Sequence, residues 1–238
     1  MPTRLNLSGR DIVLCAVLTA LPLLGYQFGI GNQVEQFPII ERLRDPNFIA
    51  GDFYTDSAAT FGPRYYYSLL VSLLTSVAPL PLVILLLTCA VNFALVLVTF
   101  ATARTRLGAT PAGAGIAAAL VIANSSFPLG LAAYLRYDSF QPASIAVPLS
   151  LFGFVLLADG KRYAAVGAFF AAALVHPLVG PQVALIAYVA WALADLAARR
   201  EFGTVLAYVP SGAPFAALLF SAWILPAMSS SQVVSMSA

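Results

Sequence analysis

Charge is almost absent from seven long apolar runs in this sequence: residues 12–30, 82–103, 111–125, 142–158, 163–177, 179–196 and 205–228. Only 9% of the 238 residues are charged, whereas a soluble domain needs roughly 25% to cover its surface. In lipid, backbone polar groups are satisfied only by helices or closed barrels, and runs without alternation favour helices. We therefore predict an all-α polytopic membrane protein with about seven transmembrane helices, surrounded by membrane lipids.

Several function classes are excluded by the residues that remain. Twelve basic and ten acidic residues give a net charge of +2, and the basic residues occur in scattered pairs. They form no basic face, so a nucleic-acid partner is not expected. The sequence holds no P-loop, HExxH, GxSxG or CxxC pattern, which removes the sequence support for nucleotide, zinc-hydrolase and serine-hydrolase chemistry. Cys15 and Cys89 lie within apolar runs and are interpreted as small buried hydrophobic residues.

One further apolar segment, residues 65–78, is too short to be an obvious transmembrane helix. It begins with three tyrosines and is followed by Pro79 and Pro81. Tyrosine clusters are typical of the membrane interface, and a length of about 14 residues is short for a span. We predict an interfacial helix, within an extracytoplasmic loop of residues 31–81.

The distribution of basic residues supports this topology. With a cytoplasmic N-terminus and an interfacial helix at 65–78, eight of the twelve basic residues are cytoplasmic: Arg4, Arg10, Arg104, Arg106, Lys161, Arg162, Arg199 and Arg200. If residues 65–78 crossed the membrane instead, every later connection would change sides and only three would be cytoplasmic. The positive-inside rule favours the first arrangement. We predict a single transmembrane domain over residues 1–238, in the cell inner (plasma) membrane.

This topology brings the polar segments to the extracytoplasmic side. Glu35 and Asp52 belong to the first of these segments, residues 31–64, and Arg136 and Asp138 belong to the second, residues 126–141. The His176-Pro177 turn is a third polar point on the same side. Any chemistry is therefore expected on that face.

Each of these residues has a structural interpretation beside a functional one. Glu35 and Asp52 can act as general bases or hold a divalent cation, or they can belong to a solvated loop, with Asp52 bonded to nearby backbone amides. Arg136 suits a phosphate and Asp138 a metal or an acceptor, or the two can pair with each other. His176, the only histidine, can end a helix or serve as a base or phosphate contact, and it lacks the clustered partners of a metal site.

The layout resembles the GT-C superfamily of membrane glycosyltransferases. The parts that carry the resemblance are a first helix, a long acidic loop (GNQVEQFPIIERLRDPNFIAGDFYTD, residues 31–56), a Tyr-rich segment (RYYYSLLVSLLTSVAPLP, residues 64–81), and a long helix ending in ATARTRLG (residues 101–108). The resemblance covers nearly the whole chain as architecture and residues 31–108 as motif. It implies transfer of a sugar from a polyprenyl-phosphate donor on the extracytoplasmic face.

The resemblance also implies a catalytic acid shortly after the first helix, where this chain departs from the pattern. The nearest positions are Asn32 and Gln33, whose amides cannot accept a proton at neutral pH, followed by Glu35. Either Glu35 has the role, or Asp52 reaches the site, or the chain lacks transferase activity. Members of the superfamily usually have more than seven helices, so the chain is interpreted as a shortened or truncated module or as one completed by a membrane protein partner. The alternative class is a non-catalytic assembly or transporter-like protein, although ion-coupled transport would favour charged residues within the helices.

Overall fold

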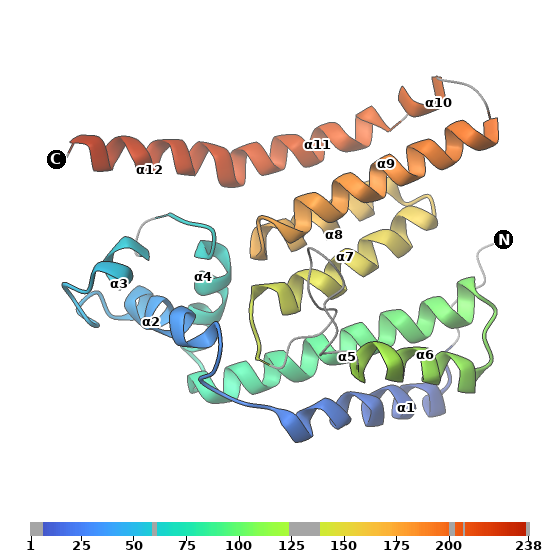
Figure 1. The fold of residues 1–238 in the computed structure, drawn as a ribbon, viewed down its shortest axis with the longest axis horizontal. Helices are drawn as coiled ribbons and strands as arrows, with labels where there is room; N and C mark the ends of the chain where they lie inside the picture. The colour runs from blue at the N-terminus through green and yellow to red at the C-terminus, as the bar shows by residue number, and fades with distance from the viewer. Residues whose placement is uncertain (1–6, 59–60, 124–138, 200–202, 207, 237–238) are drawn as a thin grey trace.

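The computed structural model describes residues 7–58, 61–123, 139–199, 203–206 and 208–236, and every regular element among them is helical. The elements are α1 (Gly9–Ala20), the 3₁₀ turn η1 (Leu21–Gly25), α2 (Gln33–Arg44), α3 (Phe53–Ala58), α4 (Tyr65–Leu74), α5 (Leu80–Arg106), α6 (Pro111–Ala123), α7 (Pro142–Ala158), α8 (Arg162–Val175), α9 (Val179–Arg199), α10 (Gly203–Leu206), α11 (Val209–Leu219), the π-helical turn η3 (Phe220–Ile224) and α12 (Leu225–Met236). Figure 1 shows a bundle of long helices with α2, α3 and α4 at one end. We call these three short helices the cap. The predicted all-α architecture is confirmed.

Three of the described helices are long and apolar enough to cross a membrane: Leu80–Arg106, Val179–Ala198 and Val209–Ser230. Four shorter apolar helices, Tyr65–Leu74, Pro111–Ala123, Pro142–Ala158 and Arg162–Val175, accompany them. A perpendicular span needs about 20 residues, so length and hydropathy support a membrane protein, and the number seven stays a prediction.

The first apolar run is divided where the sequence predicts one continuous helix. α1 ends at Ala20, and residues Leu21–Gly25 form the 3₁₀ turn η1, with Pro22 in its first turn. Proline has no N–H to donate and its ring crowds the preceding turn, so an α-helix does not continue regularly through it. The backbone then becomes extended at Tyr26 and leads to the cap.

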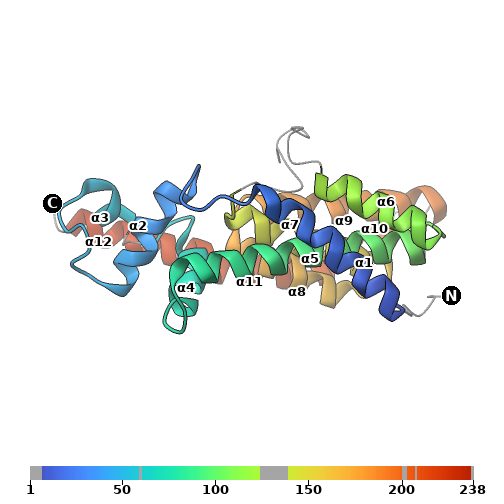
Figure 2. The same cartoon turned by 90° about the horizontal axis from the view of Figure 1, so that it is seen from below.

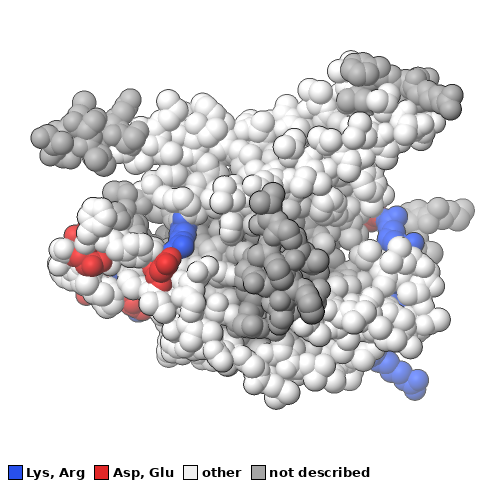
Figure 3. All heavy atoms as spheres, viewed as in Figure 1, with Lys and Arg blue, Asp and Glu red and all other residues white. Residues whose placement is uncertain are grey.

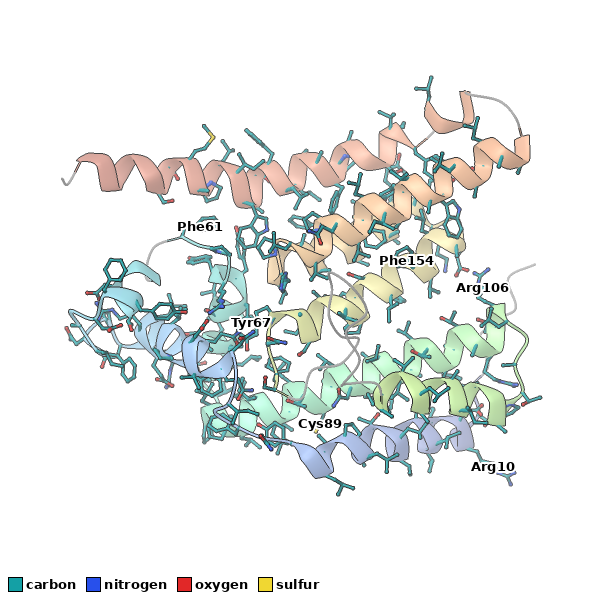
Figure 4. The ribbon with its side chains drawn as sticks, in the orientation of Figure 1. Arg10, Phe61, Tyr67, Cys89, Arg106 and Phe154 are labelled. Atoms are coloured by element: carbon teal, nitrogen blue, oxygen red, sulfur yellow. The ribbon has the colours of Figure 1, made fainter. Side chains whose placement is uncertain are left out.

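Three apolar clusters hold the elements together. Leu95 and Phe100 of α5 pack with Ala118 of α6 and with α1, while Phe169 of α8 packs with α7, α9 and α11. The third cluster, which includes Tyr67, joins the cap to α5, and Figure 4 shows Tyr67 where the cap meets the bundle. The cap is thus anchored by buried side chains rather than by loop connections alone.

Charges separate to the two ends of the bundle. Arg10 and Arg106 both lie at the end opposite the cap (Figure 4), and Arg106 forms an ion pair with Asp159. The acidic residues visible in Figure 3 gather mainly over the cap. Figures 1 and 2 show that α5, α7 and α9 all begin near the cap and end at the basic end. The helix segments between the two ends carry almost no charge, and the orientation in the membrane stays a prediction.

Candidate functional site

A cavity of about 310 Å³ lies where the cap meets the bundle. Its polar lining comes from four places in the sequence: α2, the residue before α4, the start of α7 and the turn between α8 and α9, which contribute Asn32, Gln36, Arg64, Gln141 and His176. The structure therefore joins the first polar segment to the His176-Pro177 turn, as the predicted topology requires. The volume is at the lower end of that of small-molecule sites.

Amide side chains fasten α2 to the start of α7 beside the cavity. Asn32 donates from Nδ2 to Oε1 of Gln141 at 2.6 Å, and Gln33 donates from Nε2 to the backbone carbonyl of Phe140 at 3.1 Å. Gln33 is fully buried and its Oε1 accepts from the backbone N–H of Gly29 at 2.7 Å. The two amides that stand where the resemblance expects an acid thus have structural roles.

Arg64 connects the cavity to the predicted base Glu35. Its Nη1 lies 2.9 Å from Oε2 of Glu35 and donates to Oη of Tyr54 at 3.0 Å. The side chains of Arg64 and Glu35 are 35% and 53% exposed, and a pair so open to water contributes only about 0–1 kcal/mol. An anion in the cavity can therefore bind the guanidinium of Arg64 in place of Glu35 with little loss of free energy.

His176 caps α9 while its side chain lines the cavity. Its Nδ1 accepts a hydrogen bond from the backbone N–H of Val179 at 3.2 Å, which assigns the proton of the neutral ring to Nε2. Burial lowers the pKa of His176, and the charge of Arg64 lowers it further. The positive end of a helix dipole also disfavours an imidazolium there. At neutral pH His176 is a neutral donor through Nε2.

Asp52 has a local role in the cap and does not line the cavity. Its Oδ2 accepts from both the N–H and the hydroxyl of Thr55, each at 2.8 Å, at the start of α3. These hydrogen bonds lower the pKa of Asp52 below its ordinary value. The interpretation of Asp52 as a carboxylate bonded to nearby backbone amides agrees with this geometry.

Other charges of the cap are also committed to one another. Arg42 lies 2.5 Å from Asp56 and donates to the carbonyl of Phe48, and Arg44 pairs with Glu41 at 3.0 Å. These pairs fold the polar segment back on itself. They leave Glu35 as the carboxylate that is connected to the cavity through Arg64.

Two of the predicted site residues, Arg136 and Asp138, lie outside the described residues. Within the part of the chain that the structure describes, no group of three or more His, Cys, Asp or Glu side chains could hold a metal ion. The carboxylates that the sequence suggested for a divalent cation, Glu35 and Asp52, have an arginine and a threonine as their partners.

Sequence reasoning missed Arg64, Gln36 and Gln141 as cavity residues. A signal for Gln36 was present, because Asn32 and Gln36 are four residues apart and share one face of a helix. Arg64 and Gln141 come from distant segments, and only the packing of the cap on α7 and α8 brings them together.

Comparison with known proteins adds no relative to this picture. No protein-family model, no curated protein and no solved structure matches the chain.

Proposed function

We propose that the chain is a multi-pass protein of the inner membrane with about seven spans and a cytoplasmic N-terminus. The support is the grouping of Arg10, Arg104, Arg106, Lys161 and Arg162 at helix ends on the side opposite the cap. Basic residues near helix ends remain cytoplasmic under the positive-inside rule. The cap and its cavity are then extracytoplasmic, and α4 is the interfacial helix.

In that orientation, the proposed function is transfer of a sugar from a polyprenyl-phosphate donor to an acceptor hydroxyl. The observation that carries it is the position of Arg64, which lines the polar cavity and at the same time holds Glu35 at 2.9 Å. Arginine binds phosphate oxygens well, and a carboxylate supplies a general base. A cation and a base thus lie beside one cavity, and the proposed topology would put that cavity at the outer membrane surface.

The proposed reaction uses the chain's own groups. Arg64 and the Nε2–H of His176 donate to the donor phosphate, near the positive end of the α9 dipole. Glu35, released from Arg64, accepts the proton of the acceptor hydroxyl while the oxygen of that hydroxyl forms a bond to C1 of the sugar. The bond between C1 and the phosphate oxygen breaks, and its electron pair leaves with the polyprenyl phosphate. The resemblance to GT-C enzymes and the polar cavity support this scheme.

The test compares two carboxylates of the same polar segment. Purified protein in vesicles is given polyprenyl-phosphate-[¹⁴C]mannose, with other labelled sugars as a panel, and loss of label from the lipid is measured. We expect Glu35→Gln to lower transfer by roughly 10²–10⁴-fold, the range of general-base effects. Asp52→Asn is the matched control, because Asp52 is bonded to Thr55 and does not line the cavity. Full activity of both variants would remove the assignment of the base to this segment.

A second candidate function, a non-catalytic assembly protein, is favoured by one observation. The helix Val209–Ser230 is long and apolar, and only 11% of its most apolar window is buried within the chain. Ile224 and Leu225 are about half exposed, so part of this helix can contact lipid or a membrane partner. A stoichiometric membrane protein that co-purifies through this helix, together with an active-site variant that keeps full function in cells, would favour assembly over transfer.

A further inference from the structure

The side chain of Gln36 is buried in the cavity wall with an unsatisfied acceptor. Gln36 is 1% exposed, and its Oε1 has no hydrogen-bond partner among the described residues. Buried carbonyl oxygens are nearly always paired in folded proteins. Oε1 is enclosed by protein atoms, but Gln36 also lines the cavity, so a rotation of its amide would let a molecule that enters the cavity supply the missing donor.

Two further amides surround the same space. Asn32, the N-cap residue of α2, lies one turn before Gln36. Its Nδ2 donates to Oε1 of Gln141, at the start of α7, at 2.6 Å. Each of the three amides carries both a donor and an acceptor group. This wall of the cavity is therefore polar and uncharged, in contrast to the Arg64 and His176 side.

Neutral groups that donate and accept together match hydroxyls, which do the same. A charged ligand group would use Arg64, whereas a purely apolar one would leave Gln36 unsatisfied. The cavity volume of about 310 Å³ lies at the lower end of the roughly 300–1,000 Å³ of small-molecule sites. That volume favours one ring over an oligosaccharide.

We propose that Gln36, with Asn32 and Gln141, forms a sugar-binding subsite that hydrogen-bonds the ring hydroxyls of a single pyranose. This inference rests on the proposed function, because it assigns the sugar of the donor to the amide wall and the phosphate to Arg64 and His176. Gln36 is the central residue, because its buried Oε1 is the acceptor that the protein itself leaves unpaired. The two walls therefore recognise different parts of one ligand.

The experiment uses different ligands to test the amide wall, formed by Asn32, Gln36 and Gln141, and the opposite wall, formed by Arg64 and His176. Wild-type protein in lipid nanodiscs is titrated with farnesyl-phosphate-linked hexoses, with farnesyl phosphate and with methyl hexopyranosides, the last followed by saturation-transfer NMR. We expect Gln36→Met, which keeps the length of the side chain but removes its amide, to weaken binding of both sugar ligands by about tenfold. Binding of farnesyl phosphate is expected to stay unchanged, and Gln36→Glu, which retains an acceptor oxygen, is expected to keep part of the sugar affinity.

The controls make every outcome decisive. Gln27→Met changes an exposed glutamine outside the cavity and is expected to bind all ligands as wild type does. Arg64→Gln is expected to weaken binding of farnesyl phosphate and to leave binding of the methyl pyranosides unchanged. Thermal unfolding of each variant shows whether it is folded, and Gln36→Leu, which also lacks the amide, replaces Gln36→Met if the latter does not fold.

Three results have different meanings. Gln36-dependent binding of methyl pyranosides without binding of either phosphate lipid would end the proposed function but keep the sugar subsite. The subsite would be overturned if Gln36→Met bound the sugar ligands as tightly as the wild type, or if the wild type bound no sugar. Either result would identify the cavity as a water-filled structural space. An equal loss for the sugar-bearing lipid and for farnesyl phosphate would also overturn it, since the two walls would then not be separate.

Discussion

At the scale of single residues, His176 links the stability of the chain to the chemistry of the cavity. Its Nδ1 accepts from the N–H of Val179, which only the neutral ring can do, and burial holds its pKa below the ordinary 6.5. Protonation therefore removes the cap of α9 and places a cation at the positive end of the helix dipole.

This arrangement predicts a loss of stability in mild acid. Above pH 6.5, the ordinary pKa, both folded and unfolded chains hold a neutral ring. Below it the unfolded chain takes up the proton first, so the free energy of unfolding falls until the pH is below the pKa of the folded state. We expect the midpoint temperature of unfolding in detergent to decrease as the pH is lowered from about 7 to about 5.

The control is His176→Asn, which retains a side-chain acceptor for the N–H of Val179. His176 is the only histidine of the chain, so the difference in slope between wild type and variant isolates it. Equal slopes in the two proteins would show that His176 does not titrate in this interval.

At the scale of the elements, the α8–α9 turn depends on a glycine. A Cβ on Gly180 would lie 2.3 Å from the backbone nitrogen of Ala173. Real Cβ atoms do not approach backbone so closely, so the two helices would have to separate. This close approach of α9 to α8 also sets the position of His176, which lies between them.

We expect Gly180→Ala to lower the free energy of unfolding by about 1–3 kcal/mol, as overpacking usually does. Gly167→Ala is the matched control on α8, because nothing lies within 4 Å of its Cβ position and alanine is the better helix former. Reversible unfolding in mixed micelles measures both. Equal behaviour of the two variants would contradict the close contact at Gly180.

The C-terminal helix is attached through an aromatic cluster at its π-helical turn. Tyr66 donates to the carbonyl of Ala222 at 2.7 Å, and the indole N–H of Trp223 donates to the carbonyl of Ala173 at 3.0 Å. The rings of Phe61 and Tyr66 pack on Trp223, with centroids 5.5 Å and 5.1 Å away. A backbone carbonyl oxygen has two lone pairs, so Ala222 can accept from this distant side chain.

Removing one hydroxyl should therefore loosen this attachment. We expect Tyr66→Phe to weaken the contact by about 1 kcal/mol and to raise hydrogen–deuterium exchange over residues 220–230. Tyr65→Phe is the control, because it keeps the neighbouring ring and leaves the Tyr66–Ala222 bond intact. Unchanged exchange in Tyr66→Phe would mean that ring packing alone holds the helix.

At the scale of the whole molecule, the membrane topology is the property on which the site depends. Single cysteines are placed at Asn47 in the cap and at Leu107 and Lys161 at the basic end, on a background without Cys15 and Cys89. Asn47 and Leu107 are exposed, and Lys161 is preferred to its neighbour Gly160, whose φ of +73° is strained for other residues.

We expect an impermeant maleimide to label Asn47→Cys in intact cells and to label Leu107→Cys and Lys161→Cys only after the membrane is opened. Helix ends rich in arginine and lysine stay cytoplasmic because moving them across the membrane is costly. The reverse pattern would place the cavity in the cytoplasm, and a donor on the extracytoplasmic face could not reach it.

Much of the architecture follows from local sequence, because lipid leaves a chain few alternatives. A charge-poor chain in a bilayer must form helices or a closed barrel, and apolar runs without alternation favoured helices. These runs located α5, α7, α8 and α9 to within a few residues. Helix ends were less predictable where proline intervenes, as at Pro22, because the break depends on how the chain continues into the cap.

The sequence alone determined the helical class, the separation of charge and the polar segments in which a site should lie, since these depend on composition and spacing. Only the tertiary structure decided which polar residues meet. It placed Arg64 and His176 at one cavity, bonded Asp52 to Thr55, and left Oε1 of Gln36 buried without a hydrogen-bond partner among the described residues. Arg64 and His176, which line the same cavity, are 112 positions apart in the sequence. They meet because the buried faces of the cap and the bundle fit together, which no local pattern encodes.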